Sequence, residues 1–483
     1  MNAASAWSLI AHNPALRGLR DLAARRGQNL WLTGGTLRDL LLGLTPPDLD
    51  LSADGDSLAL GQALAAVLGG RYVLLKESQA TCRVVLEGAH LDLVGLRAPD
   101  IQADLRLRDF TINALAAPLA PALAGRPSII DPTGGLADLQ ARRLRLAGPR
   151  VLADDPLRVL RAYRFQASHA LHFAPGLDEA LGAAAPGLFR VPRERVAQEW
   201  RKLMAAPGAG PAVLAMERDQ VLTRLLPELA PGRGVEQNPF HHLDVLGHNL
   251  ATLSHLEELA APAAPYAGSR LLDEAAAYLA DGPRRPLLKT AALLHDLGKP
   301  RTRRPKSPGW ATFHRHDLEG ARLALGASRR LGLSKAEAGQ IAGLVAGHMR
   351  PFHLLGLAAK GQLSPRAVRR LLEASGADLP GLFLLGLADT MAGRGPERPA
   401  DAEERLLALY AQVADLRDRQ LAQALAAPPL LDGHQLMAGL GLAPGPQVGR
   451  LLRRLREAQL DGLVATAHQA LELAREMLNP RRR

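Results

Sequence analysis

The sequence predicts an α+β protein, with a mixed α/β unit at its amino-terminal end and helices alone after it. Segments in which apolar and polar residues alternate, as in half-buried strands, occur early in the chain and fade after Asp131. Beyond that point apolar residues recur at helical spacing, and Gly and Pro mark the ends of the segments. A chain of 483 residues is too long for one ordinary hydrophobic core, so we expect several domains.

The first unit is predicted to alternate between helices and strands. The predicted elements are a helix at 6–26, a strand at 29–33, a helix at 36–44, a turn and strand within 46–52, a helix at 59–70 and antiparallel strands at 71–75, 81–88 and 90–96. Later segments with clear helical spacing lie at 154–168, 193–205 and 286–298. Stretches rich in Pro, Gly and Ala at 205–212, 229–239, 261–268 and 425–432 predict loops or linkers.

The composition excludes several classes of protein. The formal net charge is +11, which favours an anionic partner such as nucleic acid, although a GC-rich genome would also give an Arg-rich protein. The single cysteine, Cys82, excludes a disulfide framework and a thiolate metal site, and we interpret it as a small strand residue in a reducing compartment. No apolar run suggests a signal peptide or a membrane span of ~20 residues, so we expect a cytoplasmic protein without membrane contact.

A pair of glycines and a pair of aspartates predict a nucleoside-triphosphate site. Asp48 and Asp50 are two residues apart, so in a strand they project from the same face. Two carboxylates at such a short distance repel each other unless a cation lies between them. Mg²⁺ is commonly bound by carboxylates and substrate phosphates together. Gly34 and Gly35, at a helix start, allow backbone N–H groups to approach phosphates, and Arg38 lies one turn further on.

Asp92 is the best candidate for a third acidic residue beside this pair. It lies in the alternating segment HLDLVGL, which is predicted to be a strand. A third carboxylate is desirable where two metal ions act on one phosphate. A lone Asp in a strand is also commonly a surface residue, so the pattern leaves both interpretations open.

Five motifs then occur in order: GGTLRDLLLGLTPPDLDL (34–51), LRDFTINALA (107–116), DPTGGLADLQARRLR (131–145), DDPLRVLRAYRF (154–165) and RVPRERVAQEWRKL (190–203). Together they resemble the bacterial class II tRNA nucleotidyltransferases, the family of CCA-adding enzymes and poly(A) polymerases. The resemblance implies a polymerase-β-like head, followed by an all-α neck, body, HD domain and tail. The domains it implies are a catalytic head at 1–130, a helical neck and body for base recognition at 131–230, an HD phosphohydrolase-like domain at 231–400 and a helical tRNA-binding tail at 401–483.

The resemblance also implies roles for residues of the head. Asp48 and Asp50 would hold catalytic Mg²⁺ ions, and tRNA with CTP or ATP would be the substrates. Arg108 and Asp109 match an Arg-Asp pair that helps to hold the sugar of the incoming nucleotide. The arginine that precedes this pair in the family is Leu107 here, and Arg106 lies next to it.

Base recognition is implied for Asp155 and Arg158, which match the acidic and basic ends of the family's neck motif. Asp154 replaces the glutamate that begins this motif. Residues at i and i+3 share a helix face, so we expect the two side chains to act together. Asp155 can accept from the amino group of cytosine or adenine, and Arg158 can donate to ring acceptors, whereas uracil and guanine oppose both contacts. An ordinary helix cap with a surface arginine would have the same spacing.

A long polar insertion is expected in most family members between the third acidic strand and the RDFT motif. Here LDLVGLR (91–97) leads almost directly into the segment at 98–110. In this family the loss of that loop is a mark of enzymes that add only CC, with the terminal A left to a separate A-adding enzyme. The sequence therefore favours CC addition, and full CCA addition with a shortened loop remains the alternative.

A second group of ligands occurs between residues 248 and 389. It resembles the HD domain that some bacterial CCA-adding enzymes carry, which implies phosphatase or phosphodiesterase activity with a divalent metal. The residues concerned are His248, His295, Asp296 and Asp389 for a core ion, with His316 and His348 for a second ion. For the protein as a whole, two other functions compete with tRNA nucleotide addition. One is a poly(A) polymerase, and the other is an HD phosphohydrolase whose head only binds RNA.

The carboxy-terminal segment combines glycines with a basic helix. Arg450, Arg453 and Arg454 follow the glycine-containing LAPGPQVGR, so they are candidates for contacts with the tRNA backbone. A solvated basic face would show the same pattern.

Overall fold

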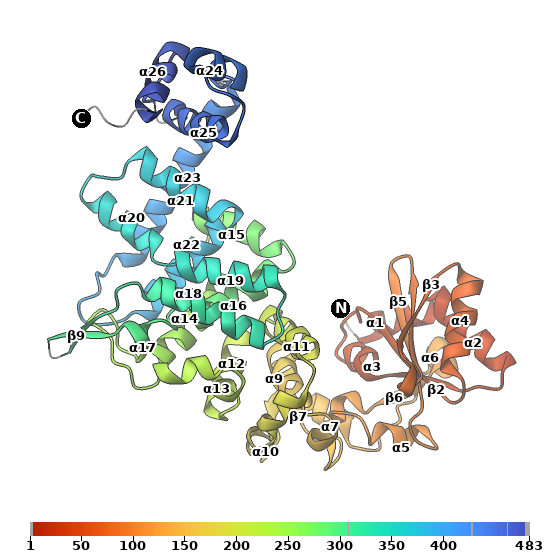
Figure 1. Ribbon diagram of the computed structural model, residues 1–483. Coiled ribbons are helices and arrows are strands. Elements are labelled where there is room, and N and C mark those ends of the chain that lie inside the picture. The colour runs from red at the N-terminus through yellow and green to blue at the C-terminus, as the bar shows by residue number, and fades with distance from the viewer. Residues whose placement is uncertain (1–2, 308, 427, 461, 479–483) are drawn as a thin grey trace. The chain divides into compact units, whose positions relative to one another are not determined.

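The computed structural model describes residues 3–307, 309–426, 428–460 and 462–478 (Figure 1). The chain separates into two compact units, one of Met1–Pro227 with Arg330–Gly332 and one of Glu228–Arg329 with Leu333–Arg483. The boundary expected at residue 230 lies close to the end of the first unit, while the finer division into four domains stays a prediction. The α+β class is confirmed, because the sheet is confined to the head and helices dominate the rest.

The head contains a six-stranded sheet in the order β3-β4-β5-β2-β1-β6. Only β2 and β5 pair in parallel, and the other neighbours are antiparallel. The strands are β1 (Leu30–Thr33), β2 (Leu49–Ala53), β3 (Arg71–Lys76), β4 (Thr81–Leu86), β5 (Ala89–Gly95) and β6 (Ala116–Pro118). The helices are α1 (Ala3–Ala11), α2 (Pro14–Arg25), α3 (Gly34–Leu41), α4 (Ser57–Leu68), α5 (Ile101–Leu105) and α6 (Leu119–Leu123), with short 3₁₀ turns at Glu77–Gln79 and Thr111–Asn113.

One face of this sheet is apolar and the other is charged. The alternating residues Leu51, Leu93 and Cys82 are buried against α2 and α4. Since successive residues of a strand point to opposite faces, the residues between them project away from this core. Burial raises the pKa of the Cys82 thiol to about 11, which fits the predicted small core residue rather than a nucleophile.

Two local expectations for the first unit were wrong. The single helix expected at 6–26 is divided into α1 and α2, because Pro14 starts a new helix and Asn13 caps it by accepting from Leu16 N at 3.1 Å. Asp155 and Arg158 do not share a helix face, since Asp155 is extended and α9 begins at Arg158. Pro156 between them explains this break, because proline disfavours helical geometry in the residue before it.

The neck and body complete the first unit with helices and one short parallel pair of strands. These elements are α7 (Gly135–Gln140), β7 (Arg143–Leu144), α8 (Val151–Asp154), α9 (Arg158–His169), β8 (His172–Phe173), α10 (Leu177–Ala184), a 3₁₀ segment at Ala185–Arg190, α11 (Arg193–Ala205), α12 (Ala209–Arg218) and α13 (Leu222–Leu225). The largest fully buried side chains of the whole described chain include Trp200 of α11 and Tyr163 of α9, two helices that pack against each other.

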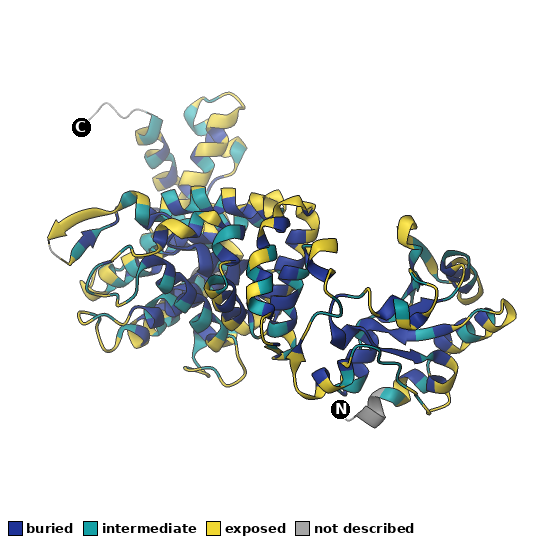
Figure 2. Ribbon diagram, turned by 90° about the horizontal axis from the view of Figure 1, so that it is seen from below, coloured by how far each residue is buried: buried dark blue, intermediate teal, exposed yellow. Residues whose placement is uncertain are grey.

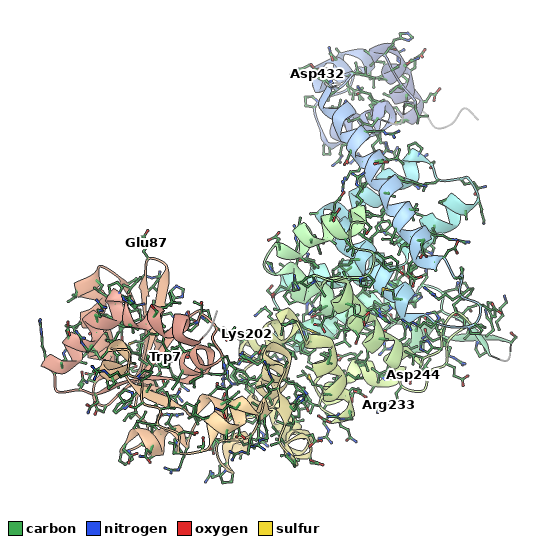
Figure 3. All side chains as sticks on the ribbon, turned by 180° about the vertical axis from the view of Figure 1, so that it is seen from behind. Trp7, Glu87, Lys202, Arg233, Asp244 and Asp432 are labelled. Atoms are coloured by element: carbon green, nitrogen blue, oxygen red, sulfur yellow. The ribbon has the colours of Figure 1, made fainter. Side chains whose placement is uncertain are left out.

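The second unit is helical apart from one hairpin. Its helices are α14 (Val245–Leu259), α15 (Arg270–Ala280), α16 (Arg284–Leu294), α17 (Lys299–Thr302), α18 (His316–Arg330), α19 (Lys335–Gly347), α20 (Arg350–Ala359), α21 (Pro365–Ser375), α22 (Leu379–Ala392) and α23 (Ala402–Ala426), with 3₁₀ turns at Pro227–Gly232 and Gly376–Asp378. The hairpin of β9 (Arg304–Ser307) and β10 (Trp310–Thr312) was not expected after Asp131. Asp244, labelled in Figure 3, caps α14 by accepting from Gly247 N at 2.6 Å.

Helix α22 forms the centre of this unit and packs against α14, α15 and α23. Its residues from Gly381 to Ala388 are all buried, and Figure 2 shows buried residues concentrated in the central helices. By length and composition the segment Pro365–Ala392 could cross a membrane, which the sequence analysis did not anticipate. More than half of its most apolar window is buried inside the protein, as in the core helix of a globular domain.

The tail forms a small helical module with its own core. Its helices are α24 (Gly433–Leu440), α25 (Pro446–Leu460) and α26 (Ala467–Leu478). Leu451 and Leu455 of α25 are buried in this core, whereas Arg450, Arg453 and Arg454 lie exposed on the same helix. The arrangement leaves the three arginines accessible, and their role in binding tRNA stays a prediction.

Two glycines, Gly298 just before α17 and Gly320 in α18, allow a close contact between these two segments. A Cβ atom on Gly298 would lie 2.0 Å from His316 O and 2.6 Å from the backbone nitrogen of Gly320. We expect Gly298→Ala to lower the free energy of unfolding by about 1–3 kcal/mol, because the added methyl group forces two backbone segments apart.

The matched control is Gly326→Ala, where a Cβ on helix α18 would meet no atom within 4 Å. We expect this change to be neutral or stabilising by up to ~1 kcal/mol. Urea and thermal unfolding of both variants measure the difference, and equal stabilities would contradict the close contact.

Candidate functional site

The three acidic residues predicted for the head come together on the charged face of the sheet. Asp50 of β2 lies directly opposite Asp92 of β5, and Asp48 immediately precedes β2. The start of α3 is tied to the same place, since Gly35 N donates to Asp50 Oδ2 at 3.1 Å. Burial raises the pKa of Asp50, and the negative charge of Asp92 raises it further. This face therefore has a strong requirement for positive charge.

Gly34 and Gly35 make room for that charge. Gly34 has a φ of +63°, which favours glycine, and a Cβ there would lie 3.1 Å from Arg108 Nη1. A Cβ on Gly35 would lie 3.2 Å from Asp50 Oδ2 and 3.6 Å from Arg38 Nη2. Because neither glycine has a side chain, the backbone at the start of α3 lies close to the Asp50 carboxylate and to the arginine guanidinium groups. One ligand could contact all of these groups.

Arg38 lies beside Gly35 but is engaged in a buried network. Its Nη2 atom is 2.7 Å from Asp39 Oδ1, its Nη1 atom donates to Asn113 Oδ1 at 2.9 Å, and its guanidinium lies over the ring of Phe165. The expected contact with phosphates stays a prediction, while the network shows what holds the side chain in place.

Arg108 and Asp109 occupy neighbouring but different environments. Arg108 Nη2 donates to Ser52 Oγ at 2.8 Å, close to Asp50. Asp109 is buried, and Arg161 Nη2 donates to its Oδ2 at 2.6 Å. Although burial alone would raise it, the charge of Arg161 holds the pKa of Asp109 well below its usual range. Asp109 therefore joins the head to helix α9 within the first unit.

The pair predicted to recognise the base is held by other partners. Arg195 Nη2 donates to Asp155 Oδ2 at 2.6 Å, and Leu157 N donates to Asp155 Oδ1 at 3.2 Å. Arg158 donates to the backbone carbonyl of Val151 at 3.0 Å. Asp155 does not cap α9, whose N-cap residue is Leu157; its Oδ1 atom accepts within the turn before that helix. The helix-cap interpretation of the sequence is therefore wrong for Asp155, and its oxygens retain acceptor capacity for a ligand.

Arg83 is a residue of this site that the sequence analysis missed. It lies opposite Asp92 in the β4–β5 ladder, and its Nε and Nη2 atoms donate to the two oxygens of Asp92 at 2.7 and 2.8 Å. The same Nη2 atom is 3.4 Å from Asp48 Oδ2. Arg83 thus holds both oxygens of Asp92 and links this third carboxylate to Asp48. The alternation around Cys82 could have indicated that Arg83 points to the charged face.

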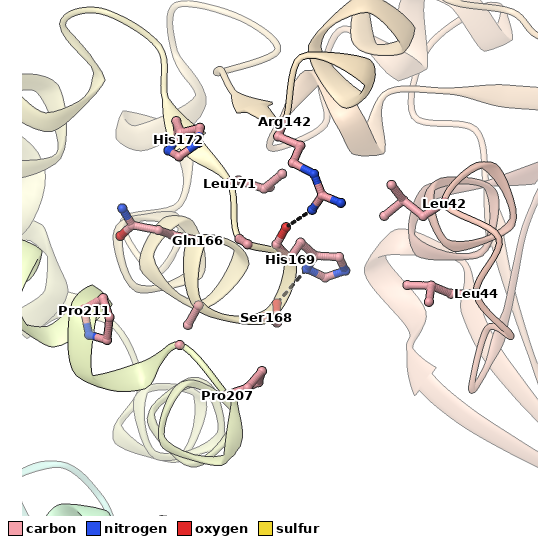
Figure 4. A pocket seen from close by; sticks show the side chains of 13 residues that line it. Leu42, Leu44, Arg142, Gln166, Ser168, His169, Leu171, His172, Pro207 and Pro211 are labelled. Atoms are coloured by element: carbon pink, nitrogen blue, oxygen red, sulfur yellow. Dashed lines mark hydrogen bonds between the residues drawn. The ribbon is translucent and has the colours of Figure 1, made fainter. Parts of the chain in front are cut away.

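A separate pocket of about 670 Å³ lies at the carboxy-terminal end of α9 (Figure 4). Arg142 Nη1 donates to His169 O at 3.2 Å, and Ser168 Oγ lies 2.7 Å from His169 Nδ1. Leu42 and Leu44 line the opposite wall, so the pocket is mainly apolar and lacks the charged groups of the head site.

In the second unit, all six predicted HD residues converge on one buried centre. His248 comes from α14, His295 and Asp296 follow α16, and Asp389 comes from α22. His316 starts α18, and His348 caps the end of α19. Asp296 lies in the middle, with Oδ2 facing His248 and His295 and Oδ1 facing His316 and His348.

The distances between these atoms fit two metal ions that share Asp296. The first group contains His248 Nε2, His295 Nε2, Asp296 Oδ2 and Asp389 Oδ1, with separations of 2.8, 3.3, 3.7 and 3.8 Å. The second contains Asp296 Oδ1, His316 Nε2 and His348 Nε2, with separations of 3.2, 3.4 and 3.7 Å. Donors around one ion at bond lengths near 2.1 Å lie about 3.0–3.4 Å apart.

The polar atoms of this centre need a cation. Nε2 of His295 and both oxygens of Asp296 are buried and have no well-aligned hydrogen bond within the part of the chain that the structure describes, although the Lys299 ammonium forms an ion pair with Oδ2 of Asp296. Although burial alone would raise it, His295 and the Lys299 ammonium hold the pKa of Asp296 well below its usual range. Burial lowers the pKa of His348 to about 4, so this imidazole is neutral and able to bind metal. The residues present therefore fit divalent ions, and the identity of the metal stays open.

The sequence analysis missed two polar residues beside this centre. Lys299 Nζ is 2.5 Å from Asp296 Oδ2 and donates to Gln237 Oε1 at 2.6 Å. His241 forms a possible ligand group with His248 and Asp389, whose ligand atoms lie within 4.8 Å of one another. The sequence contained a signal for each of them: Lys299 ends the HDLGK segment, and His241 belongs to the His-His pair at 241–242. Both residues line a pocket of about 940 Å³ that opens from the metal centre.

Comparisons with known proteins find family matches in three stretches of the chain. Residues 30–145 match the Poly A polymerase head domain, residues 245–419 the HD domain, and residues 171–232 a probable RNA and SrmB-binding site of polymerase A. An A-adding tRNA nucleotidyltransferase of Deinococcus radiodurans is 37% identical over 91% of this chain and 93% of its own length. A CC-adding tRNA nucleotidyltransferase of Thermus thermophilus is 34% identical over 90% of this chain and 91% of its own length.

Solved structures show the same fold. A Thermotoga maritima CCA-adding enzyme in complex with tRNA has a TM-score of 0.60 at 19% identity, covering 98% of both chains. A CCA-adding enzyme with CTP has a TM-score of 0.63 at 19% identity, also covering 98% of both chains. A polymerase-type head joined to a helical HD protein defines the class, and the chain belongs to the tRNA nucleotidyltransferase family.

The contact between Arg83 and Asp92 gives a prediction for the head. Arg83→Met leaves the charges of Asp92 and Asp48 uncompensated, so we expect nucleotide addition to fall by at least about tenfold and Mn²⁺ affinity to change. In Arg83→Met/Asp92→Asn both partners of the pair are neutral, and we expect part of the lost activity to return.

Rates of nucleotide addition and Mn²⁺ binding followed by electron paramagnetic resonance measure this coupling in a double-mutant cycle. A double variant no more active than Arg83→Met would show that Asp92 is needed for itself, as the third metal ligand expected from the sequence.

Proposed function

We propose that this protein adds CC to the 3′ end of tRNA without a template, using CTP and releasing pyrophosphate. The proposal takes its reaction from the family, and the observation that carries the choice of CC is the short connection after β5. Strand β5 ends at Gly95 and α5 begins at Ile101, and Arg97 closes the connection by donating to Asp104 Oδ1 at 2.9 Å. The two relatives described above do not decide between CC and A addition, because one is named an A-adding and the other a CC-adding enzyme. The choice of CC addition therefore rests on the short connection.

In the proposed reaction the 3′-hydroxyl of tRNA attacks the α-phosphate of CTP in line, and pyrophosphate leaves. Asp48 and Asp50 would hold Mg²⁺, which would lower the pKa of the hydroxyl and stabilise the leaving oxygens. Gly35 and Arg38 lie where the phosphates would approach the start of α3. Arg108, held by Ser52 at the same edge, and Asp109 would position the sugar.

Cytosine selection is assigned to Asp155 and Arg158. Asp155 would accept from the amino group of the base, and Arg158 would donate to its ring nitrogen and carbonyl. A uracil in the same place would leave these groups unpaired, at a cost on the order of 1–3 kcal/mol each. Arg195 supports the first contact because it holds the Asp155 carboxylate at 2.6 Å.

The proposed setting is the cytoplasm, where a separate A-adding enzyme would complete the CCA end. Arg450, Arg453 and Arg454 would contact the tRNA backbone, since all three are exposed on α25. Full CCA addition is the alternative for the same site, and it requires ATP to be accepted after the second C.

The expected product decides between these activities. With a tRNA that lacks CCA, and with CTP and ATP both present, we expect extension by two C residues and no terminal A. Asp48→Ala and Asp50→Ala should each abolish the extension, since the metal ligands are lost. Asp21→Ala, at an exposed position of α2, is the matched control and should extend normally.

Sequencing of the extended 3′ ends measures the outcome. A product that ends in A would refute CC-only addition, and addition of A alone to a tRNA ending in CC would indicate an A-adding enzyme. Near-normal extension by either Asp variant would contradict the assignment of the head site.

We propose a second activity, a metal-dependent phosphohydrolase, at the HD centre. The observation that favours it is the pair of ligand groups that share Asp296, because two metal ions held by these groups would be able to bind a phosphate ester and its attacking water. The pocket of about 940 Å³ gives a substrate access to this centre. An HD phosphohydrolase with a head that only binds RNA is the remaining alternative, and it would show no CTP incorporation.

We expect His295→Ala/Asp296→Ala to lose bound metal and hydrolysis of bis(p-nitrophenyl) phosphate, while CTP addition by the head continues. Inductively coupled plasma mass spectrometry measures the metal content. His353→Ala, beside the same pocket but outside the ligand groups, serves as a control with unchanged metal content. Equal metal content in the wild type and the double variant would contradict the centre.

A further inference from the structure

His241 lies next to the first metal group, on the loop that precedes α14. It lines the HD pocket together with Asp296 and Asp389. Its ring centroid is 4.7 Å from that of His248, and the ligand atoms of His241, His248 and Asp389 lie within 4.8 Å of one another. His241 is not one of the six predicted HD residues, yet it lies close to two of them, His248 and Asp389. This proximity needs its own explanation.

Three of the HD histidines share one hydrogen-bonding arrangement. The Nδ1 atoms of His295, His316 and His348 each lie 2.6–2.8 Å from the backbone carbonyl of the residue three positions earlier. A proton on Nδ1 satisfies that carbonyl and leaves the lone pair of Nε2 free for a metal ion. Metal-binding histidines commonly have such an acceptor on the nitrogen that does not bind the metal.

His241 repeats this arrangement with a side-chain acceptor. Its Nδ1 atom lies 2.9 Å from Oδ1 of Asn238, again three positions earlier. The Asn238 oxygen also accepts from Phe240 N at 3.2 Å, so the amide is oriented by the turn it stabilises. The lone pair on Nε2 of His241 is then available for a metal ion.

The loop that carries His241 is held against the segment after α22. Gly395 N donates to Phe240 O at 2.9 Å, and Glu397 N donates to Pro239 O at 3.2 Å. A Cβ on Gly395 would lie 2.2 Å from Pro239 O, so a glycine is needed for this approach. The position of His241 relative to Asp389 of α22 is therefore set by backbone contacts rather than by a free loop.

We propose that His241 binds, through Nε2, the metal ion that is held by His248, His295, Asp296 and Asp389. This proposal rests on the second proposed function, since it concerns the metal centre of the HD pocket. The ion would then have three imidazole and two carboxylate ligands. Such a nitrogen-rich set favours a transition-metal ion over Mg²⁺, which prefers oxygen ligands.

The chain offers a matched control in the next residue. His242 has the same side chain and is exposed, and its Nδ1 atom accepts from Arg394 N at 3.3 Å. His242→Ala therefore removes an imidazole from the same loop without touching the proposed ligand set.

The experiment uses the full chain with Asp48→Ala and Asp50→Ala, so that metal bound at the head does not contribute. After removal of metal, Co²⁺ is titrated and followed by visible absorption, and the bound metal is counted by mass spectrometry. We expect two Co²⁺ ions in the parent protein. His241→Ala should weaken one of them by at least about tenfold and alter its absorption spectrum, while His242→Ala should bind as the parent does.

His241→Gln provides a second variant of similar size, and thermal unfolding of the metal-free proteins shows whether each variant is folded. Two Co²⁺ ions bound with parent affinity and spectrum by a folded His241 variant would overturn the proposal and leave the HD centre intact. A parent protein that binds no Co²⁺ would overturn the HD centre and this proposal together.

Discussion

Repulsion between carboxylates placed close together shapes both candidate sites of this protein. In the head, the strand register brings Asp50 directly opposite Asp92, with Asp48 at the edge. In the second unit, Asp296 is buried beside Asp389. Each centre is stable only where positive or proton-donating groups surround the acids, because an uncompensated buried charge is costly.

The two units meet this requirement in different ways. The head uses arginines from several segments: Arg83 of β4 donates to Asp92, and Arg108 lies near Asp50 beside Gly34. The HD centre uses imidazoles from four different helices or helix ends, together with the Lys299 ammonium. Arginine remains charged at all ordinary pH values, whereas a neutral imidazole can bind a metal ion. The arginines of the head are therefore suited to binding an anionic triphosphate, whereas the imidazoles of the HD centre are suited to binding metal ions directly.

Glycines set the close approaches on which both centres depend. Gly34 and Gly35 let the start of α3 lie against Asp50, and Gly298 lets the HD turn lie against the start of α18. The short connection from β5 to α5 is a further constraint of the same kind, since the Arg97–Asp104 contact leaves it little freedom. In the proposed function the short length of this connection is the feature on which the choice of CC addition rests.

The strands β1 to β5 of the head and the shared face of Asp48 and Asp50 could be predicted from the sequence, because they depend on alternation and on a two-residue spacing. The six HD residues that the structure brings together were predicted from the family resemblance and the adjacent His295-Asp296 pair. The β9–β10 hairpin was missed, since β9 is exposed throughout and β10 is only three residues long. The break before α9 was missed because the motif spacing was given more weight than Pro156.

The sequence by itself determined which side chains share one face of a strand or helix, because side-chain direction follows from backbone periodicity. Only the tertiary structure decided the partners. Arg83 reaches Asp92 through strand register, Arg161 reaches Asp109 from the neck, and His241 reaches the HD centre through a loop held by Gly395. These contacts join residues far apart in the chain, and the packing that brings them together has no local pattern in the sequence.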